Sequence, residues 1–189
     1  RDGPLDMRMD RSRGQTAAQL LATIDEAELA QALAELGDEP DAPRIAAALV
    51  KARKQKPIER TADLARTISD AAGTDLKAWQ LHPTKGKWNL HPAARTFQAL
   101  RLLVNRELAV LEQLMRLLPY MLKPGGAAAI ISFHSGEDRR VKAAFRDGQR
   151  AGVYAEISPD PLRPGEKERF ENPRARSAKL RWGRTAIPG

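Results

Sequence analysis

The sequence predicts an α/β fold organised around one strand of small and β-branched residues. Residues 127–133 follow the turn Pro124-Gly125-Gly126 and carry no polar alternation, which is typical of a central strand buried on both faces of a sheet. An apolar helix pattern precedes this strand, and a charged helix and two further strand patterns follow it. Ligands of open α/β sheets bind beyond the carboxyl ends of the strands, so we expect functional side chains at residues 132–135.

The first part of the chain is predicted to be helical. Apolar residues recur there at helical spacing, and Thr, Pro and Gly stand where helices begin and end. The expected helices run from Gln15 or Thr16 to Gly37 with a break near Asp25-Glu26, over residues 44–54 with Pro57 behind them, and over residues 62–72 between a Thr61 cap and a closing Gly73.

The helical pattern is lost between Gly73 and His91, where Lys and Trp are interleaved in a loop-like segment. Trp79, Trp88 and the run Lys85-Gly86-Lys87 suit stacking on bases and contact with phosphates. Trp rings packed as a lid on the helices explain the same residues, because aromatic side chains mostly serve burial. Both interpretations stay open on the sequence.

A long buried crossover helix is predicted over residues 93–121, directly after the extended dipeptide His91-Pro92. Its apolar stripe is too broad for an exposed helix. Free backbone N–H groups in its first turns favour an anion or a carboxylate from a loop. The polar side chains in those turns are Arg95, Thr96, Gln98 and Arg101.

After the central strand the pattern predicts one helix and two strands. The helix covers residues 137–146 and packs one apolar face back on the sheet. A short strand follows over residues 153–157, a proline-interrupted loop over 159–164, and a basic turn over 172–177 that leads into a last strand over 178–182.

The balance of charge indicates a polyanionic partner. The 189 residues carry 32 Lys and Arg against 24 Asp and Glu, which gives a net charge of +8 and a pI near 10.1. RNA or DNA is the partner class that such an excess favours. A basic surface that merely keeps the protein soluble remains the alternative.

The composition excludes several classes of site. There is no Cys, so disulfides, thiolate catalysis and Cys-based zinc sites are excluded, and with three His in total we expect no metal site. No apolar run approaches the roughly 20 residues that span a bilayer, so we expect a cytoplasmic protein without a membrane partner. The chain begins with Arg1-Asp2-Gly3-Pro4 and no Met, which suggests a fragment or a processed product.

Four segments in order along the chain carry a resemblance to a known family. They are residues 2–10, 91–101, 131–135 and 172–181, and together they span the whole chain. They resemble the ribosomal RNA small subunit methyltransferase H family. The resemblance implies transfer of a methyl group from S-adenosylmethionine to N4 of a cytidine in the decoding region of small-subunit (16S) rRNA. It also implies a Rossmann-like methyltransferase sheet with an inserted all-helical domain, and small-subunit rRNA or the 30S ribosomal subunit as partner.

The same resemblance implies three parts: residues 1–10 as a loop from the methyltransferase core, 11–90 as a helical substrate-recognition insertion, and 91–189 as the C-terminal half of the core. The family's glycine-rich cofactor loop lies upstream of the segment with which this chain begins, and no G-x-G-x-x-G turn occurs in the 189 residues. We therefore expect the C-terminal portion of an rRNA (cytosine-N4)-methyltransferase that lacks the main S-adenosylmethionine-binding loop and is inactive alone. The alternative is a non-catalytic rRNA-binding or ribosome-assembly module.

The implied chemistry assigns roles to the predicted site. The amino group of cytosine is a poor nucleophile, so a catalyst must flip the base out, hold N4 against the methyl group and accept hydrogen bonds from the amine. Ser132, His134 and Ser135 can supply acceptors, and Phe133 can stack on the base. The alternative is that Phe133 is a core residue and His134 a hydrogen-bonded structural residue.

Two further sets of residues follow from the resemblance. Asp6, Met7 and Asp10 are expected beside the cofactor, or the two carboxylates order their loop against Arg95 or Arg101. The basic residues expected to contact rRNA phosphates, or else to be solvated surface, are Arg95, Arg101, Arg139, Arg140, Arg174, Arg176 and Lys179.

Missing strands would leave an exposed sheet edge, so the isolated chain is expected to form a homodimer or to aggregate.

Overall fold

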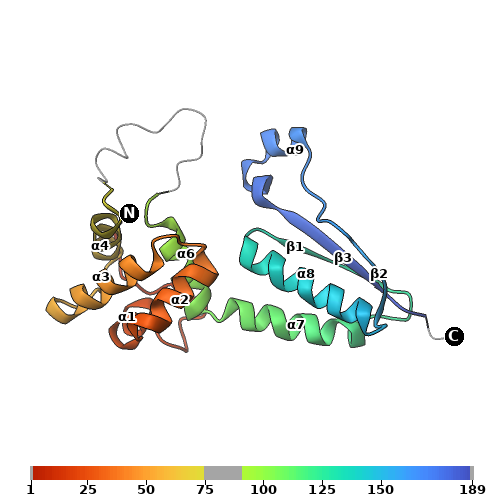
Figure 1. Cartoon of the computed structure of the whole chain (residues 1–189), viewed down its shortest axis with the longest axis horizontal. Coiled ribbons are helices and arrows are strands. Elements are labelled where there is room, and N and C mark those ends of the chain that lie inside the picture. Colours follow the sequence, from red (N-terminus) through yellow and green to blue (C-terminus); the bar gives the residue numbers. More distant parts are fainter. Residues whose placement is uncertain (1, 75–90, 188–189) are drawn as a thin grey trace. The chain divides into compact units, whose positions relative to one another are not determined.

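The computed structural model describes residues 2–74 and 91–187, which form a mixed α/β structure (Figure 1). They divide into two compact units, Arg1–Arg106 and Glu107–Gly189, which we describe separately. The first unit is helical and the second holds the sheet. None of the helices in the described ranges is long and apolar enough to cross a membrane. The segment that contains Trp79 and Trp88 lies outside the described residues, so its two interpretations stay predictions.

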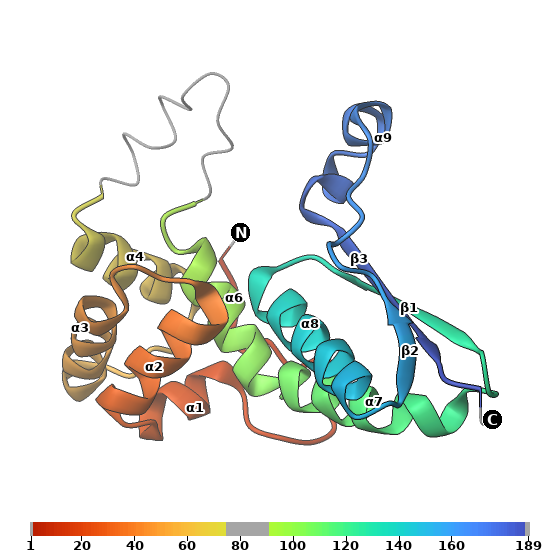
Figure 2. The same cartoon turned by 45° about the vertical axis from the view of Figure 1, so that its right-hand side comes forward.

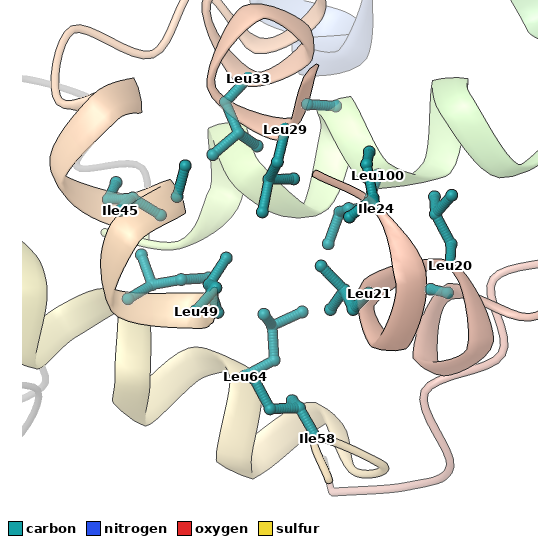
Figure 3. Close-up of a cluster of buried hydrophobic side chains, with 14 of the residues drawn as sticks. Leu20, Leu21, Ile24, Leu29, Leu33, Ile45, Leu49, Ile58, Leu64 and Leu100 are labelled. Atoms are coloured by element: carbon teal, nitrogen blue, oxygen red, sulfur yellow. The ribbon is translucent and has the colours of Figure 1, made fainter. Parts of the chain in front are cut away.

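The helices of the first unit surround one apolar core. Those that the structure describes are α1 Ala17–Thr23, α2 Glu26–Gly37, α3 Ala42–Gln55, α4 Thr61–Ala72 and α6 Ala94–Val104. Figure 3 shows Leu29, Leu33, Ile45, Leu49 and Leu64 pointing into a shared interior, where each is at most 1% exposed. Full burial of one such side chain contributes about 1.5–3 kcal/mol, so this core holds the unit together.

Local residues set two helix ends of the first unit where the sequence predicts them. Thr16 Oγ1 accepts from the backbone N of Gln19, and the Gln19 side chain accepts from the backbone N of Thr16. Gly73 closes α4 in the left-handed region, with φ of 67°. The predicted Thr61 cap is wrong: Thr61 is the first residue of α4, and its hydroxyl accepts from the backbone N of Gly3 at 3.0 Å.

The N-terminal segment 2–10 is a fixed part of the first unit. Leu5 is 2% exposed, and its carbonyl O accepts from the backbone N of Ala18 at 3.0 Å. Asn105 holds the far end of the segment, because its side chain accepts from the backbone N of Met9 at 2.8 Å and donates to the carbonyl O of Met7 at 2.9 Å. Buried packing and these hydrogen bonds therefore order the loop without regular secondary structure.

The predicted single helix over residues 93–121 is wrong, because the chain breaks after α6 and starts again as α7 Glu107–Met121. Arg106 takes a left-handed backbone conformation with φ of 51°, which no α-helix continues. The expected burial also fails: Val110 is 63% exposed and Leu117 50%. The apolar stripe on α7, although wide enough for a buried helix, is thus partly exposed to solvent.

The helix α6 packs against α2 in the first unit, whereas the sequence places residues 91–106 with the methyltransferase core. Gly37 lets the two helices approach, since an added Cβ there would lie 2.6 Å from the carbonyl O of Arg95. Leu100 on α6 is 0% exposed and belongs to the shared core. The boundary between the two compact units therefore falls after Arg106.

The second unit is a three-stranded antiparallel sheet with helices on one side (Figure 2). The strand order is β1-β3-β2, so the last strand of the chain lies between the other two. Two strand predictions are confirmed, and the final strand runs further than expected. The elements are α7, β1 Ala127–Ser132, α8 Ser135–Arg150, β2 Tyr154–Ile157, α9 Glu166–Glu171, the 3-10 helix η1 Pro173–Ser177 and β3 Lys179–Thr185.

The expectation that residues 127–133 form a central strand buried on both faces is wrong for the described chain. β1 is an edge strand that ends at Ser132, and its exposure alternates, with Ile131 56% exposed. α8 contacts the sheet through Phe145 and Tyr154, whose ring centroids lie 5.2 Å apart. Alanine fits either face of a sheet, so an Ala-rich strand does not reveal in its sequence which side is uncovered.

Candidate functional site

The predicted site lies where β1 ends and α8 begins. Ser132 is 3% exposed, and its Oγ donates to the carbonyl O of Lys179 on the neighbouring strand β3 at 3.4 Å. Phe133 is 54% exposed, so in this structure its ring does not belong to the core. The chain thus turns one polar side chain inward and presents one aromatic ring to solvent at the end of the strand.

His134 caps the N-terminus of α8. Its Nδ1 accepts from the backbone N of Glu137 at 3.3 Å, and Oε2 of Glu137 accepts from the backbone N of Phe133 at 3.0 Å. Because Nδ1 accepts, the proton of the neutral ring resides on Nε2. Nε2 lies 3.0 Å from Oε1 of Glu137, but this buried group has no well-aligned hydrogen-bond partner. The arrangement holds the strand-to-helix turn in place.

Glu137 stays ionised in this turn. Burial raises the pKa of its carboxyl group, but the nearby His134 ring and the hydrogen bond from the backbone N of Phe133 outweigh burial and bring the pKa below its ordinary value of 4.5. The group is therefore a carboxylate at neutral pH when it accepts from Phe133. The His134 ring is fixed by this carboxylate and by the helix backbone, which favours the structural interpretation of its role.

A buried charge network lies behind the turn, and sequence reasoning missed its centre. Asp138 Oδ1 accepts from Nε of Arg181 at 2.7 Å, and Oδ2 lies 3.3 Å from Nζ of Lys179. Arg181 is 4% exposed and Asp138 8%. Burial raises the pKa of Asp138, but the two cations outweigh burial and lower it overall. The sequence does contain a signal for this network. Cations alternate along a strand at positions 179 and 181, and this pattern indicates a buried carboxylate partner.

Three of the predicted phosphate contacts belong to α8 and β3. Lys179 directs its ammonium group to Asp138, as above, and its side chain is 22% exposed. Arg140 pairs through Nε with Glu112 on α7 at 2.8 Å and donates to the carbonyl O of Gly136 at 3.2 Å. Arg139 is exposed on α8. Arg139 is thus the most accessible of the three to a polyanion.

The loop carboxylates predicted beside the cofactor are held by neighbours within the first unit. Asp6 binds Arg8 through Oδ1 at 2.7 Å, which lowers the pKa of Asp6 to about 2. Asp10 accepts from the Ser12 hydroxyl at 2.6 Å and lies 2.8 Å from Nε of Arg13. These pairs order the loop locally.

The remaining basic positions are exposed. Arg95 and Arg101 lie on the solvent side of α6 in the first unit. Arg174 and Arg176 lie on η1 in the second unit, and Nε of Arg176 donates to the carbonyl O of Arg169 on α9 at 3.4 Å. These four cations therefore lie on the surface, two in each unit.

The described residues do not form a cradle for a metal ion or for the implied S-adenosylmethionine. No three His, Asp or Glu side chains gather among them. A nucleotide-type cofactor needs a glycine-rich turn and a free carboxylate at a strand end, but Glu137 and Asp138 are already engaged. A cavity of about 810 Å³ in the second unit is lined by α7, α8 and the start of β2, not by residues 132–135.

The chain is similar to a family of methylases over most of its length. The MraW methylase family matches residues 1–186. Ribosomal RNA small subunit methyltransferase H of Acidobacterium capsulatum is 48% identical over 180 residues, which cover 95% of this chain and 56% of that protein.

Two further relatives bear the same name. The protein from Geobacter sp. strain M21 is 45% identical and that from Citrifermentans bemidjiense 44%, each over 197 aligned residues that cover 95% of this chain and 60% of the relative. The chain thus spans between 56% and 60% of the length of these curated relatives.

Proposed function

The chain belongs to the MraW methylase family, and from this premise we propose that it is the C-terminal portion of a methyltransferase that acts on small-subunit rRNA. The observation that carries the proposal is the family match over residues 1–186, together with identities of 44% to 48% to relatives named for that activity. The net charge of +8 supports a polyanionic substrate.

The finer proposal is S-adenosylmethionine-dependent methylation of N4 of a cytidine in the decoding region of 16S rRNA. In this proposal the three-stranded sheet is the C-terminal end of a Rossmann-like sheet, residues 11–90 form the helical insertion, and residues 1–10 and 91–189 belong to the core. The main cofactor-binding loop is not in this chain, which agrees with the absence of a G-x-G-x-x-G turn from its 189 residues. Alone, the chain does not catalyse.

The end of β1 is proposed to meet the flipped base. Phe133, at 54% exposure, offers a ring on which cytosine can stack. Ser132, Ser135 and His134 are the proposed polar groups around it, with His134 acting as a positioning residue because its ring caps α8. The proposed phosphate contacts are Arg95, Arg101, Arg139, Arg140, Arg174, Arg176 and Lys179.

Binding of the 189-residue chain to 30S subunits and to small-subunit rRNA tests the proposal. We expect binding that weakens with salt, and the double variant Arg174→Glu with Arg176→Glu to lower the slope of log K against log salt by about 1 to 2. Arg146→Glu, an exposed cation on α8 outside the predicted contacts, is the matched control. Equal affinity for small-subunit rRNA and an unrelated RNA, with unchanged slopes, would contradict the proposal.

A non-catalytic rRNA-binding or ribosome-assembly module is the second candidate. The observation that favours it is the structural use of Glu137 and Asp138, which leaves the strand end without a free carboxylate. Sequencing the gene on the 5′ side of the Arg1 codon separates the two candidates. A glycine-rich strand-turn-helix in frame supports the methyltransferase, and an in-frame upstream segment without one supports the module.

A further inference from the structure

The segment between β2 and β3 is not an irregular loop but forms a small lobe held by backbone hydrogen bonds. It contains α9 and η1, and in Figures 1 and 2 it extends beyond the end of the sheet. Leu162 and Leu180 exchange two backbone hydrogen bonds of 2.9 Å at its base, and the backbone N of Ala178 donates to the carbonyl O of Ala175 at 2.9 Å. Ala175 is 5% exposed, so the lobe has a small buried centre.

Phe170 is not part of that centre. Its side chain is 85% exposed on a helix in which no residue is buried. An exposed phenyl ring that contributes nothing to the packing of its own lobe is a candidate contact for a ligand with a flat face. The surroundings of the ring decide which ligand.

A hollow of about 340 Å³ lies beside Phe170 and is lined by Glu166, Arg169, Phe170 and Arg176. The bond from Arg176 Nε to the carbonyl O of Arg169 fixes η1 against α9 and so sets the Arg176 side chain beside the ring. Within the described residues the side chains of Arg169 and Arg174 have no carboxylate partner. An aromatic face, cationic groups and one carboxylate therefore meet at one place.

This combination matches one nucleotide of a single strand. A base stacks on an aromatic face, and guanidinium groups bind the flanking phosphates. A carboxylate accepts from the exocyclic amino group that cytosine and adenine carry and uracil lacks. A base within a duplex is stacked on its neighbours and cannot enter such a hollow.

Building on the proposed function, we infer that the hollow beside Phe170 binds a nucleotide of single-stranded rRNA, with the base on the Phe170 ring and phosphates at Arg169 and Arg176. Glu166 gives the hollow a preference for cytosine or adenine over uracil. The hollow lies on the lobe and is a recognition site for the substrate strand, additional to the proposed flipped-base position at the end of β1.

The test uses the full 189-residue chain with fluorescent RNA strands of about eight nucleotides, made of cytidine, adenosine or uridine. Phe170→Ala should weaken binding of the cytidine strand about tenfold. Tyr120→Ala removes an equally exposed ring, 87% accessible on α7, and should leave binding unchanged. Phe170→Trp should restore binding, and Glu166→Ala, which removes the acceptor, should bring the cytidine and uridine strands to equal affinity.

The outcomes separate this inference from the proposed function. If Phe170→Ala and Tyr120→Ala bind the RNA strands with equal affinity and both keep the wild-type melting temperature, the nucleotide site beside Phe170 is overturned. RNA binding by the chain as a whole is then unaffected. Failure of the wild-type chain to bind any RNA overturns the proposed substrate class itself. A change in sedimentation of Phe170→Ala without a change in RNA affinity identifies a protein interface and also overturns the inference.

Discussion

The two units of the molecule bury their apolar surface to different degrees. Among the described residues, Met9 is the only large exposed hydrophobic side chain of the first unit, whereas the second unit exposes a stripe on α7 and the residues Ile131 and Phe133 around β1. The first unit closes its core with its own helices. The second leaves apolar side chains and the edge of β1 uncovered among the described residues, and such exposed apolar patches and open strand edges are sites where further contacts form.

The difference extends to what holds each unit together. The first relies on a core of Leu and Ile side chains (Figure 3), and the second on a smaller apolar cluster plus the buried pair of Asp138 and Arg181. A buried ion pair is strongly destabilised when one partner is removed, because the other charge remains without compensation.

The largest effect is expected for Arg181→Ala in the second unit. Asp138 would stay buried with Lys179 as its remaining cation and without its bidentate partner, at a cost of up to about 3–5 kcal/mol in the free energy of unfolding. Arg184→Ala on the same strand is the matched control, since its pair with Glu156 at 3.6 Å is exposed and contributes at most about 1 kcal/mol. Urea unfolding followed by circular dichroism measures both. Equal effects of the two variants would show that the buried ion pair contributes no more to stability than the exposed one.

The same pair predicts a dependence of stability on pH. The pKa of Asp138 is lowered in the folded state from its ordinary value of 3.8, so its contribution is fully present above that value and is lost as the pH falls through the folded pKa. Asp138→Asn should remove this loss of stability at acid pH. If Asp138→Asn still lost stability at acid pH as the wild-type chain does, other groups would be its cause.

Next comes Leu64→Ala, which opens a cavity in the closed core of the first unit. Leu64 is 0% exposed, and the expected loss is about 2–5 kcal/mol. Leu117→Ala makes the same chemical change at a site 50% exposed on α7 in the second unit, with an expected effect within about 0.5 kcal/mol. Similar losses in urea unfolding would mean that the stripe on α7 is buried in solution and that the comparison fails.

A smaller effect is expected on self-association through the open edge of β1. Its sequence of Ala, Ile and Ser has no charge or proline to prevent pairing with a second copy. Ile131→Lys should weaken association of the chain about tenfold in sedimentation. Ala155→Lys on β2, the other edge strand, should change little, because Glu156 already protects that edge. Equal loss in both variants would contradict pairing through β1.

The smallest effect is expected at His134. His134→Ala removes the cap of α8 and should lower stability by about 1 kcal/mol, whereas His134→Asn keeps a good capping side chain and should restore it. Thermal unfolding compares the two variants. If Asn fails to restore stability, the ring itself, through its contact with Glu137, carries the structural role.

Features set by neighbouring residues could be predicted from the sequence, and features set by distant ones could not. Thr16 and Gly73 act on their own helix ends, so the predicted boundaries there are confirmed. The break at Asn105 depends on hydrogen bonds to Met7 and Met9, nearly a hundred positions earlier, which no local pattern reveals.

The candidate site also combines features set by neighbouring residues with features set by distant ones. Its position at the end of a strand followed from the apolar run that stops at Ser132. The capping role of His134 could have been read from Glu137 three residues later, since that spacing is typical of a reciprocal cap. The partner of Asp138 could not, because it arrives with β3 from the end of the chain.

Calorimetric titration of S-adenosylmethionine into the 189-residue chain shows whether the chain holds a cofactor site of its own. We expect no saturable heat, because the carboxylates at the end of β1 are engaged and no G-x-G-x-x-G turn is present in the sequence. Saturable binding with a dissociation constant near ~1 µM, about −8 kcal/mol, would contradict this expectation and would place a complete cofactor site within this chain.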